Sequence, residues 1–353
     1  MRVSAILVVN DRPSSGGLVE QTGSSGSSYA YADILGGSAL NRIATRLRAA
    51  GIQGISMIGD ANLPGLPSSR DVEITVADKL FERWLAAQRT LREHAARGID
   101  IVFMVGVGAY VELDVIDALK FHITRGTPLT QLENSTGALD CWIVDTRWFC
   151  SAATGCSLPF RYGEFPGLPV PYLIDGYVNR LENPHDLRRL VMDMFLGRCE
   201  AKPSGRETKP GVWIEAGARV HRATRLVAPV YVGRSTVLGP SAVLTRFSNL
   251  ERHSAVGEGT IVDRATILPH TIVGKGLNLS ESIADGVNLT DLSRNVTVQV
   301  NDRSLLAATQ SSESFKSHRK FSVQSSRTRS RALEYSEYLS RAAGRLSEVF
   351  FGG

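Results

Sequence analysis

The sequence has few cysteines, few lysines and no long hydrophobic run. Four cysteines occur in 353 residues, without a CxxC pair and without a histidine at ligand spacing, which excludes a disulfide framework and a cysteine zinc site. The longest apolar stretch, Ile101 to Val111, is shorter than the roughly 18 residues that span a bilayer. The N-terminal segment lacks the apolar core of a signal peptide. We therefore expect a cytoplasmic protein with reduced thiols.

Lysine is scarce because arginine carries most of the positive charge. The chain has 33 arginines against 7 lysines, and its net charge is +5. An arginine excess attracts phosphates, sugar nucleotides or anionic lipid headgroups. The arginines are too widely spread to predict a nucleic-acid partner.

A six-residue repeat is the strongest pattern in the chain. Branched aliphatic residues recur at every sixth position: Ile214, Val220, Leu226, Val232, Leu238, Leu244, Leu250, Val256, Val262 and Leu268. Mostly small residues stand two positions earlier: Ala218, Thr224, Val230, Thr236, Ala242, Ser248, Ser254, Thr260 and Thr266. Each sextet predicts a short strand and a turn with the aliphatic side chain pointing inward, and neighbouring coils supply the backbone partners.

This pattern resembles the hexapeptide-repeat family, whose members form left-handed parallel β-helices. It predicts such a helix over residues 212–300, with about five coils of three sextets by Val300. After Leu268 the phase slips by one residue and resumes at Val273. The resemblance implies a homo-oligomer formed through the β-helix. It does not select a function, because this architecture serves acyltransferases, nucleotidyltransferases and structural proteins alike.

Residues 1–205 alternate between strand-like and helix-like segments. The periodicity predicts helices over Ala39–Ala50, Lys79–Arg97 and Val115–Arg125, and strands over Ala5–Asn10, Ile55–Ile58, Ile101–Val107 and Cys141–Val144. This alternation predicts an α/β/α sandwich with a mostly parallel sheet.

The order of these segments resembles the sugar-phosphate nucleotidyltransferases, such as the mannose-1-phosphate and glucose-1-phosphate enzymes. The resemblance is carried by the runs LGGSALNRIATRLRAAGIQGISMIGD, VELDVIDALKFHITRGTPLT, LPVPYLIDGYVNRLENPHDLRRLVMDMFLGR and APVYVG. It spans most of residues 1–300 and implies a Rossmann-like (GT-A-like) domain followed by a β-helix. It also implies a setting in sugar-nucleotide or surface-polysaccharide biosynthesis.

At the positions where that family binds phosphate, the residues of this chain differ from the family pattern. Nucleotidyl transfer concentrates negative charge, so it needs cations and close backbone amides at the phosphates. The resemblance places these groups in the loop with Arg12, Gly16 and Gly17 and at the pair Gly36-Gly37. The family's Gly-x-Gly-Thr-Arg spacing is missing, and no lysine precedes Lys79.

The metal-binding device departs as well. The resemblance places one Mg²⁺-binding aspartate at the end of a strand carrying Gly106, where this chain has Gly108, and the second at Arg180. Asp175 is a weak substitute ligand. Asp114 and Asp117 fit the first turn of a helix better than a metal site.

These departures suggest a non-catalytic nucleotidyltransferase homologue with no metal and no other cofactor. We expect it to bind a sugar nucleotide or sugar phosphate, with Arg12 and Arg180 in place of metal, and to act as a regulator or scaffold. An active homologue is a candidate partner. An active transferase with rearranged ligands and Mg²⁺ is the first alternative.

A β-helix acyltransferase is the second alternative. Such enzymes use a histidine as general base beside bound acyl-CoA. The candidates are His221, His253 and His270, and His253 is favoured because Glu251 and Glu258 are placed to orient it.

The C-terminal segments differ in composition from the rest. Residues 301–331 form a basic Ser/Arg-rich linker, and residues 332–353 predict an amphipathic helix. This helix is expected to dock on the protein or a second subunit, or to contact a membrane.

Overall fold

The structure is a computed structural model that describes residues 1–9, 29, 32–59, 72–77, 80–151, 158 and 168–309. The chain folds as two compact units. The first comprises Met1–Ala32 and Gly37–Leu190, and the second comprises Asp33–Gly36 and the chain from Val191 onward. Four residues between the first strand and the first helix therefore belong to the second unit.

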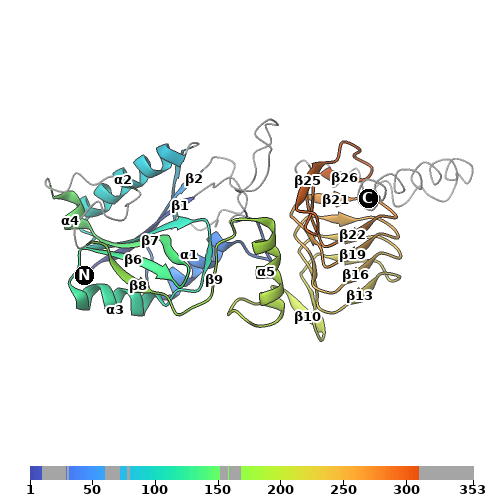
Figure 1. The fold of residues 1–353 in the computed structure, drawn as a ribbon, viewed down its shortest axis with the longest axis horizontal. Helices are drawn as coiled ribbons and strands as arrows, with labels where there is room; N and C mark the ends of the chain where they lie inside the picture. The colour runs from blue at the N-terminus through green and yellow to red at the C-terminus, as the bar shows by residue number, and fades with distance from the viewer. Residues whose placement is uncertain are drawn as a thin grey trace, which may run out of the picture. The chain divides into compact units, whose positions relative to one another are not determined.

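A seven-stranded sheet forms the centre of the first unit, in the order β3-β2-β1-β4-β7-β6-β8 (Figure 1). Its strands are β1 (Val3–Val9), β2 (Ile55–Gly59), β3 (Val72–Val76), β4 (Ile101–Val107), β6 (Leu129–Asn134), β7 (Gly137–Asp145) and β8 (Val170–Leu173). Strands β3, β2, β1 and β4 run parallel, whereas β7 is antiparallel to both of its neighbours. The predicted mostly parallel sheet is confirmed.

Helices cover both faces of this sheet. They are α1 (Ala39–Ala49), α2 (Leu80–Ala96), α3 (Val115–Arg125) and the short α4 (Thr146–Cys150). Alternate β1 residues point to opposite sides, since Leu7 packs in the cluster with α1 and α3, whereas Ile6 packs in the cluster with α2 and α4. The first unit is therefore an α/β/α sandwich.

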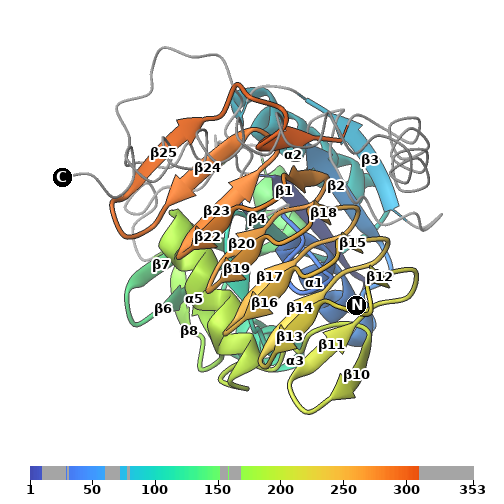
Figure 2. The same ribbon diagram turned by 90° about the vertical axis from the view of Figure 1, so that its right-hand side faces the viewer.

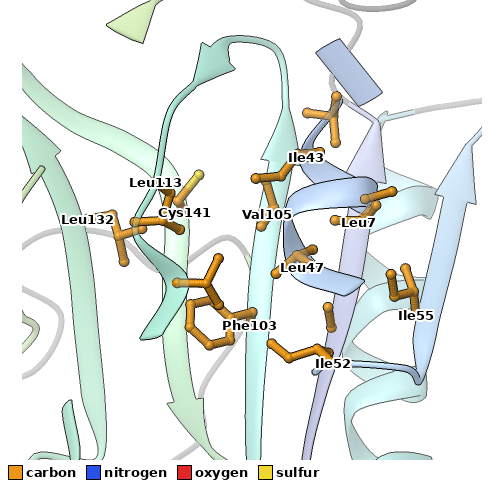
Figure 3. Close-up of a cluster of buried hydrophobic side chains, with 14 of the residues drawn as sticks. Leu7, Ile43, Leu47, Ile52, Ile55, Phe103, Val105, Leu113, Leu132 and Cys141 are labelled. Carbon is orange, nitrogen blue, oxygen red and sulfur yellow. The ribbon is translucent and has the colours of Figure 1, made fainter. Parts of the chain in front are cut away.

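The local sequence explains where helix α1 begins and which of its faces packs on the sheet. Ser38 caps its first turn by accepting a hydrogen bond from the Asn41 amide. Its apolar stripe includes Ile43 and Leu47, which face Leu7 on the sheet (Figure 3).

The second unit contains a parallel β-helix in which each coil contributes one strand to each of three sheets (Figure 2). The first sheet holds β11 (Val212–Ile214), β14 (Val230–Val232), β17 (Ser248–Leu250), β20 (Thr266–Ile267) and β23 (Ser282–Asp285). The second holds β12 (Arg219–Val220), β15 (Val237–Leu238), β18 (Ala255–Val256) and β21 (Thr271–Val273). The third holds β13 (Arg225–Val227), β16 (Val243–Thr245), β19 (Ile261–Asp263) and β22 (Asn278–Ser280).

The aliphatic positions of the repeat form the core of this unit. Val232, Leu244 and Leu250 are fully buried, and so are the small residues beside them, such as Thr236 and Ser254. The predicted inward direction of the aliphatic positions is confirmed.

The phase slip comes one step earlier than the sequence predicts. Leu244 pairs with Val262, eighteen residues further along the chain, but Leu250 pairs with Ile267, a step of seventeen. The ladder therefore continues through Ile267 and not through Leu268.

A shorter corner causes this slip. The corner after β16 has two residues with positive φ, Arg246 and Phe247, whereas the corner after β19 has Arg264 alone among the described residues. The corner after β19 is therefore one residue shorter than the corner after β16. The six-residue pattern does not show this difference, because the residues at 267 and 268 are both aliphatic.

The regular coils end before Val300. Four coils carry all three strands, and β23 begins a fifth. The chain then reverses into β24 (Asn288–Asp291) and β25 (Val296–Gln299), and β26 (Leu306–Ala308) pairs antiparallel with β21. The prediction of coils as far as Val300 is wrong, because these antiparallel strands close the end of the β-helix. At the other end, β10 (Arg206–Lys209) pairs antiparallel with β11.

The predicted tail helix and residues 310–331 of the predicted basic linker lie outside the described residues. The prediction of a linker from residue 301 is wrong, because residues 301–309 contain β26, which pairs with β21 of the β-helix. Within the described part of the chain, no helix is both long and apolar enough to cross a membrane.

Candidate functional site

The topology of the first unit favours a ligand at one edge of its sheet. From β1 the chain proceeds to β2 on one side, and it later returns to β4 on the other side of β1. Ligands of open α/β sheets bind at such a switch point, outside the carboxyl ends of the strands. Val9 and Val107, the last residues of β1 and β4, are paired at this edge.

Two of the predicted glycines lie at this edge. Gly106 is buried within β4 and pairs with Val8, whereas Gly108 follows the end of the strand and is partly exposed. Gly108 therefore stands where the family resemblance places a metal-binding aspartate, but it offers no side-chain oxygen.

A two-stranded ribbon follows Gly108. Strand β5 (Tyr110–Val111) pairs antiparallel with β9 (Val178–Asn179). The Tyr110 hydroxyl donates to a carboxylate oxygen of buried Glu112 at 2.6 Å, and the rings of Tyr110 and Tyr177 lie 6.0 Å apart. The ribbon thus brings two aromatic side chains and a carboxylate beside the sheet edge. Glu112 and Tyr177 lie in runs that carry the family resemblance, but nothing in the sequence indicates that they meet Tyr110.

Gly176 fits this ribbon because it has no side chain. A Cβ at this position would lie 1.9 Å from the Glu112 carbonyl oxygen. Glycine at position 176 is therefore a packing requirement of this structure.

The Arg180 side chain donates hydrogen bonds to the hairpin between β6 and β7 in the first unit. Its Nε donates to the Thr136 hydroxyl at 3.2 Å, and one terminal nitrogen donates to the Gly137 carbonyl oxygen at 3.1 Å. Further bonds reach the Asn134 side chain and the Ala138 carbonyl. All three guanidinium nitrogens thus stabilise the turn between β6 and β7.

The residues at the expected metal positions do not fit Mg²⁺. Gly108 has no donor atom, and the Arg180 guanidinium cannot donate electrons to a cation. The side chain of Asp175 is exposed. Among the described residues, no three histidine, cysteine or acidic side chains gather as a metal site would require.

Asp114 and Asp117 belong to helix α3, as the sequence predicts. Asp114 caps the helix by accepting from the Asp117 amide at 2.9 Å. Asp117 in turn accepts a bond from the Tyr172 hydroxyl at 2.6 Å. Burial, this bond and the nearby carboxylates raise the pKa of Tyr172 above its usual range.

Arg83 is a buried cation at the same sheet edge. Its side chain is 1% exposed, and it donates to the carbonyl oxygens of Val9 at 3.0 Å and Ala77 at 2.7 Å. It thereby joins the carboxyl ends of β1 and β3. Nothing in its sequence neighbourhood distinguishes it from the other arginines.

The glycine pair Gly36-Gly37 is divided between the units, and Gly36 lies in the second. There the Glu251 carboxylate accepts hydrogen bonds from the amides of Leu35 at 2.8 Å and Gly36 at 3.3 Å. A Cβ on Gly36 would lie 2.5 Å from the Ser204 side chain. An internal carboxylate thus holds amides that the resemblance assigns to phosphate.

Polar neighbours complete this arrangement. The Asn249 side-chain amide donates to Glu251 at 2.7 Å, and its oxygen accepts from the Thr266 hydroxyl at 2.7 Å. Asp33 forms an ion pair with Arg252 at 3.0 Å. Burial raises the pKa of Glu251 to about 8, although the bonds from Asn249 and Leu35 oppose the shift.

His253 lies at a corner of the β-helix. Its ring stacks on that of His270 from the next coil, with centroids 5.1 Å apart. Burial, His270 and two nearby arginines lower the pKa of His253. The predicted orienting residues act elsewhere, since Glu251 holds Leu35 and Gly36 and Glu258 lies 3.6 Å from Lys275.

Three predicted phosphate-binding residues belong to the loop after β1. They are Arg12, Gly16 and Gly17, and they lie outside the described residues. Their proposed contact with a ligand stays a prediction.

Comparisons with known proteins add little. No protein-family model matches the chain, and no curated protein matches it. Similar solved structures include HddC from Yersinia pseudotuberculosis complexed with GMP-PN, at 15% identity and a TM-score of 0.37, and a second structure of HddC at 13% and 0.39. Each match covers 54% of this chain and 97% of that chain. Structural similarity at these TM-scores does not support a conclusion about the fold or function of this chain. The fold follows from the strand order and register given above.

Proposed function

We propose that this protein binds a sugar nucleotide or sugar phosphate without a divalent metal and acts as a regulator or scaffold in sugar-nucleotide or surface-polysaccharide biosynthesis. The bond between the Glu251 carboxylate and the Leu35 and Gly36 amides carries this proposal. Amides that are already bonded to an internal carboxyl group are not free to hold a phosphate, so the arrangement differs from that of a working transferase.

The ligand site we propose is the carboxyl edge at the switch point of the first unit. Gly108 at the end of β4 is partly exposed, and the partly exposed Tyr177 offers a ring surface for a base or sugar, packed against the buried Tyr110. Arg83 places a positive charge at the end of β1, which favours phosphate electrostatically.

Calorimetric titration of the full chain tests this proposal. The panel comprises sugar nucleotides, a sugar 1-phosphate, nucleoside triphosphates and acetyl-CoA, each with EDTA and with Mg²⁺. We expect one sugar nucleotide or sugar phosphate to bind with equal affinity in both buffers, and no pyrophosphate release from a triphosphate plus a sugar 1-phosphate.

Other outcomes separate the alternatives. Binding of a triphosphate that requires Mg²⁺, together with turnover, would establish an active transferase with rearranged ligands. Binding of acetyl-CoA alone would move the function to the β-helix and to His253. The absence of binding by any compound would contradict a ligand-binding role.

A further inference from the structure

Residues Asp33–Gly36, here called the latch segment, pack within the second unit although the chain on both sides belongs to the first. Asp33, Ile34 and Leu35 are at most 4% exposed. The Ser204 amide donates to the Leu35 carbonyl at 3.0 Å, which adds a backbone bond to those that join the segment to Glu251. The latch segment is therefore buried in the second unit and bonded to it through its backbone.

The backbone of the latch segment is strained. Leu35 has φ +51° and Gly36 has φ +90°. A left-handed conformation is unfavourable for leucine, and it persists only where the surroundings hold it in place. The bonds from the Leu35 and Gly36 amides to Glu251 hold this conformation directly.

The two oxygens of Glu251 are unequally bonded. One oxygen accepts from the Leu35 amide at 2.8 Å and from Asn249 at 2.7 Å, whereas the other has the long 3.3 Å contact with the Gly36 amide. This asymmetry suits a protonated carboxyl group, whose carbonyl oxygen is the better acceptor and whose hydroxyl oxygen is the poorer one.

Charged groups around Glu251 also favour its protonated form. Asp33 in the latch segment is acidic, and so is Glu215, two coils before Glu251, whose carboxylate oxygen would lie 2.7 Å from a Cβ on Gly36. Arg252 is the nearby cation and is paired with Asp33. The Tyr231 hydroxyl, buried on the same face, is neutral at physiological pH because burial and these carboxylates raise its pKa.

From this geometry we infer that the latch segment is a pH-sensitive conformational switch, closed on the β-helix while Glu251 carries its proton and released when Glu251 ionises. Release lets water reach the charged carboxylate and frees the amides of Leu35 and Gly36. It also relaxes the strained backbone at Leu35.

The direction and range of the switch follow from proton linkage. Glu251 has a pKa of about 8 when buried, against an ordinary value of 4.5 when hydrated. The closed state therefore holds a proton that the open state has lost, so opening becomes more favourable as the pH rises through this interval. The change levels off above about pH 8, where both states are ionised.

Hydrogen exchange at the Leu35 and Gly36 amides tests the inference in the full chain. Protection factors, corrected for the intrinsic pH dependence of exchange, are measured from pH 5 to pH 9. We expect protection in the wild type to fall roughly 400-fold between pH 5 and pH 8 and then to level off. Glu251→Gln mimics the protonated acid and should remain protected throughout. Glu258→Gln, which removes an exposed carboxylate of the same unit, should behave like the wild type.

Constant protection in the wild type would overturn the inference, as would an equal fall in Glu251→Gln. If Glu251→Gln does not fold, the ¹³C shift of the Glu251 carboxyl group in the wild type replaces it. A titration midpoint near 8 that coincides with the end of the fall in protection supports the switch, and a midpoint near 4.5 contradicts it. These readouts use no ligand, so they are independent of the proposed sugar-nucleotide binding.

Discussion

At the scale of single residues, Gly176 makes the closest backbone approach in the candidate ligand site. A Cβ there would lie 1.9 Å from the Glu112 carbonyl oxygen, which is part of the backbone and cannot rotate away. We expect Gly176→Ala to destabilise the first unit by about 3 kcal/mol. Gly54→Ala is the matched control, because its Cβ would meet only an ordinary contact at 3.6 Å. Urea unfolding measures both, and equal effects would contradict the packing argument.

Substitution of Arg180 distinguishes a structural role of this residue from a role in ligand binding. Its guanidinium bonds the hairpin between β6 and β7, so Arg180→Lys should lower the stability of the first unit by about 1 kcal/mol. It should leave the affinity for sugar nucleotides unchanged within about twofold. Arg189→Lys, on the exposed face of α5 (Pro184–Phe195), is the control. A large loss of affinity at unchanged stability would return Arg180 to the ligand site.

The residue scale is also where the sequence is least informative. The resemblance does not predict that Gly176 packs against the Glu112 backbone or that Arg180 bonds a hairpin. It likewise misses Glu251 as the partner of Leu35, because the two residues are more than two hundred positions apart. Such long-range polar contacts leave no periodic signal in the sequence.

At the scale of elements, strand β19 contrasts two neighbouring aliphatic residues. Val262 is fully buried in the β-helix, whereas Ile261 is 40% exposed. Val262→Ala should cost about 2 kcal/mol of stability in the second unit, and Ile261→Ala should cost well under about 1 kcal/mol. Equilibrium unfolding followed by circular dichroism distinguishes them. Similar losses at both positions would show that the coil register is wrong.

Elements are predicted well from this sequence because their signals are local. The helices over residues 39–50 and 115–125 appear nearly where periodicity and caps place them, and the aliphatic ladder appears as far as Val262. The slip to Ile267 was misplaced because Leu268 is also aliphatic and buried. The antiparallel end of the β-helix was missed because closing strands need not keep the six-residue period.

At the scale of the whole molecule, the two units have separate hydrophobic cores. One pair of clusters lies on the two faces of the seven-stranded sheet, and another fills the β-helix. We therefore expect urea to produce two unfolding transitions, with Gly176→Ala shifting one and Val262→Ala shifting the other. A single transition that both substitutions shift equally would show that the units unfold together.

We propose that the first unit binds its ligand without a metal, because Gly108 stands where the family resemblance places a metal-binding aspartate. Gly108 does not have a positive φ, so a side chain there meets no backbone strain. The decisive measurement is calorimetric titration of the wild type and of Gly108→Asp with the same sugar nucleotide, in EDTA and in Mg²⁺. We predict equal affinity of the wild type in both buffers and a Mg²⁺-dependent gain in Gly108→Asp. Binding by the wild type only in the presence of Mg²⁺, or no binding at all, would contradict the account.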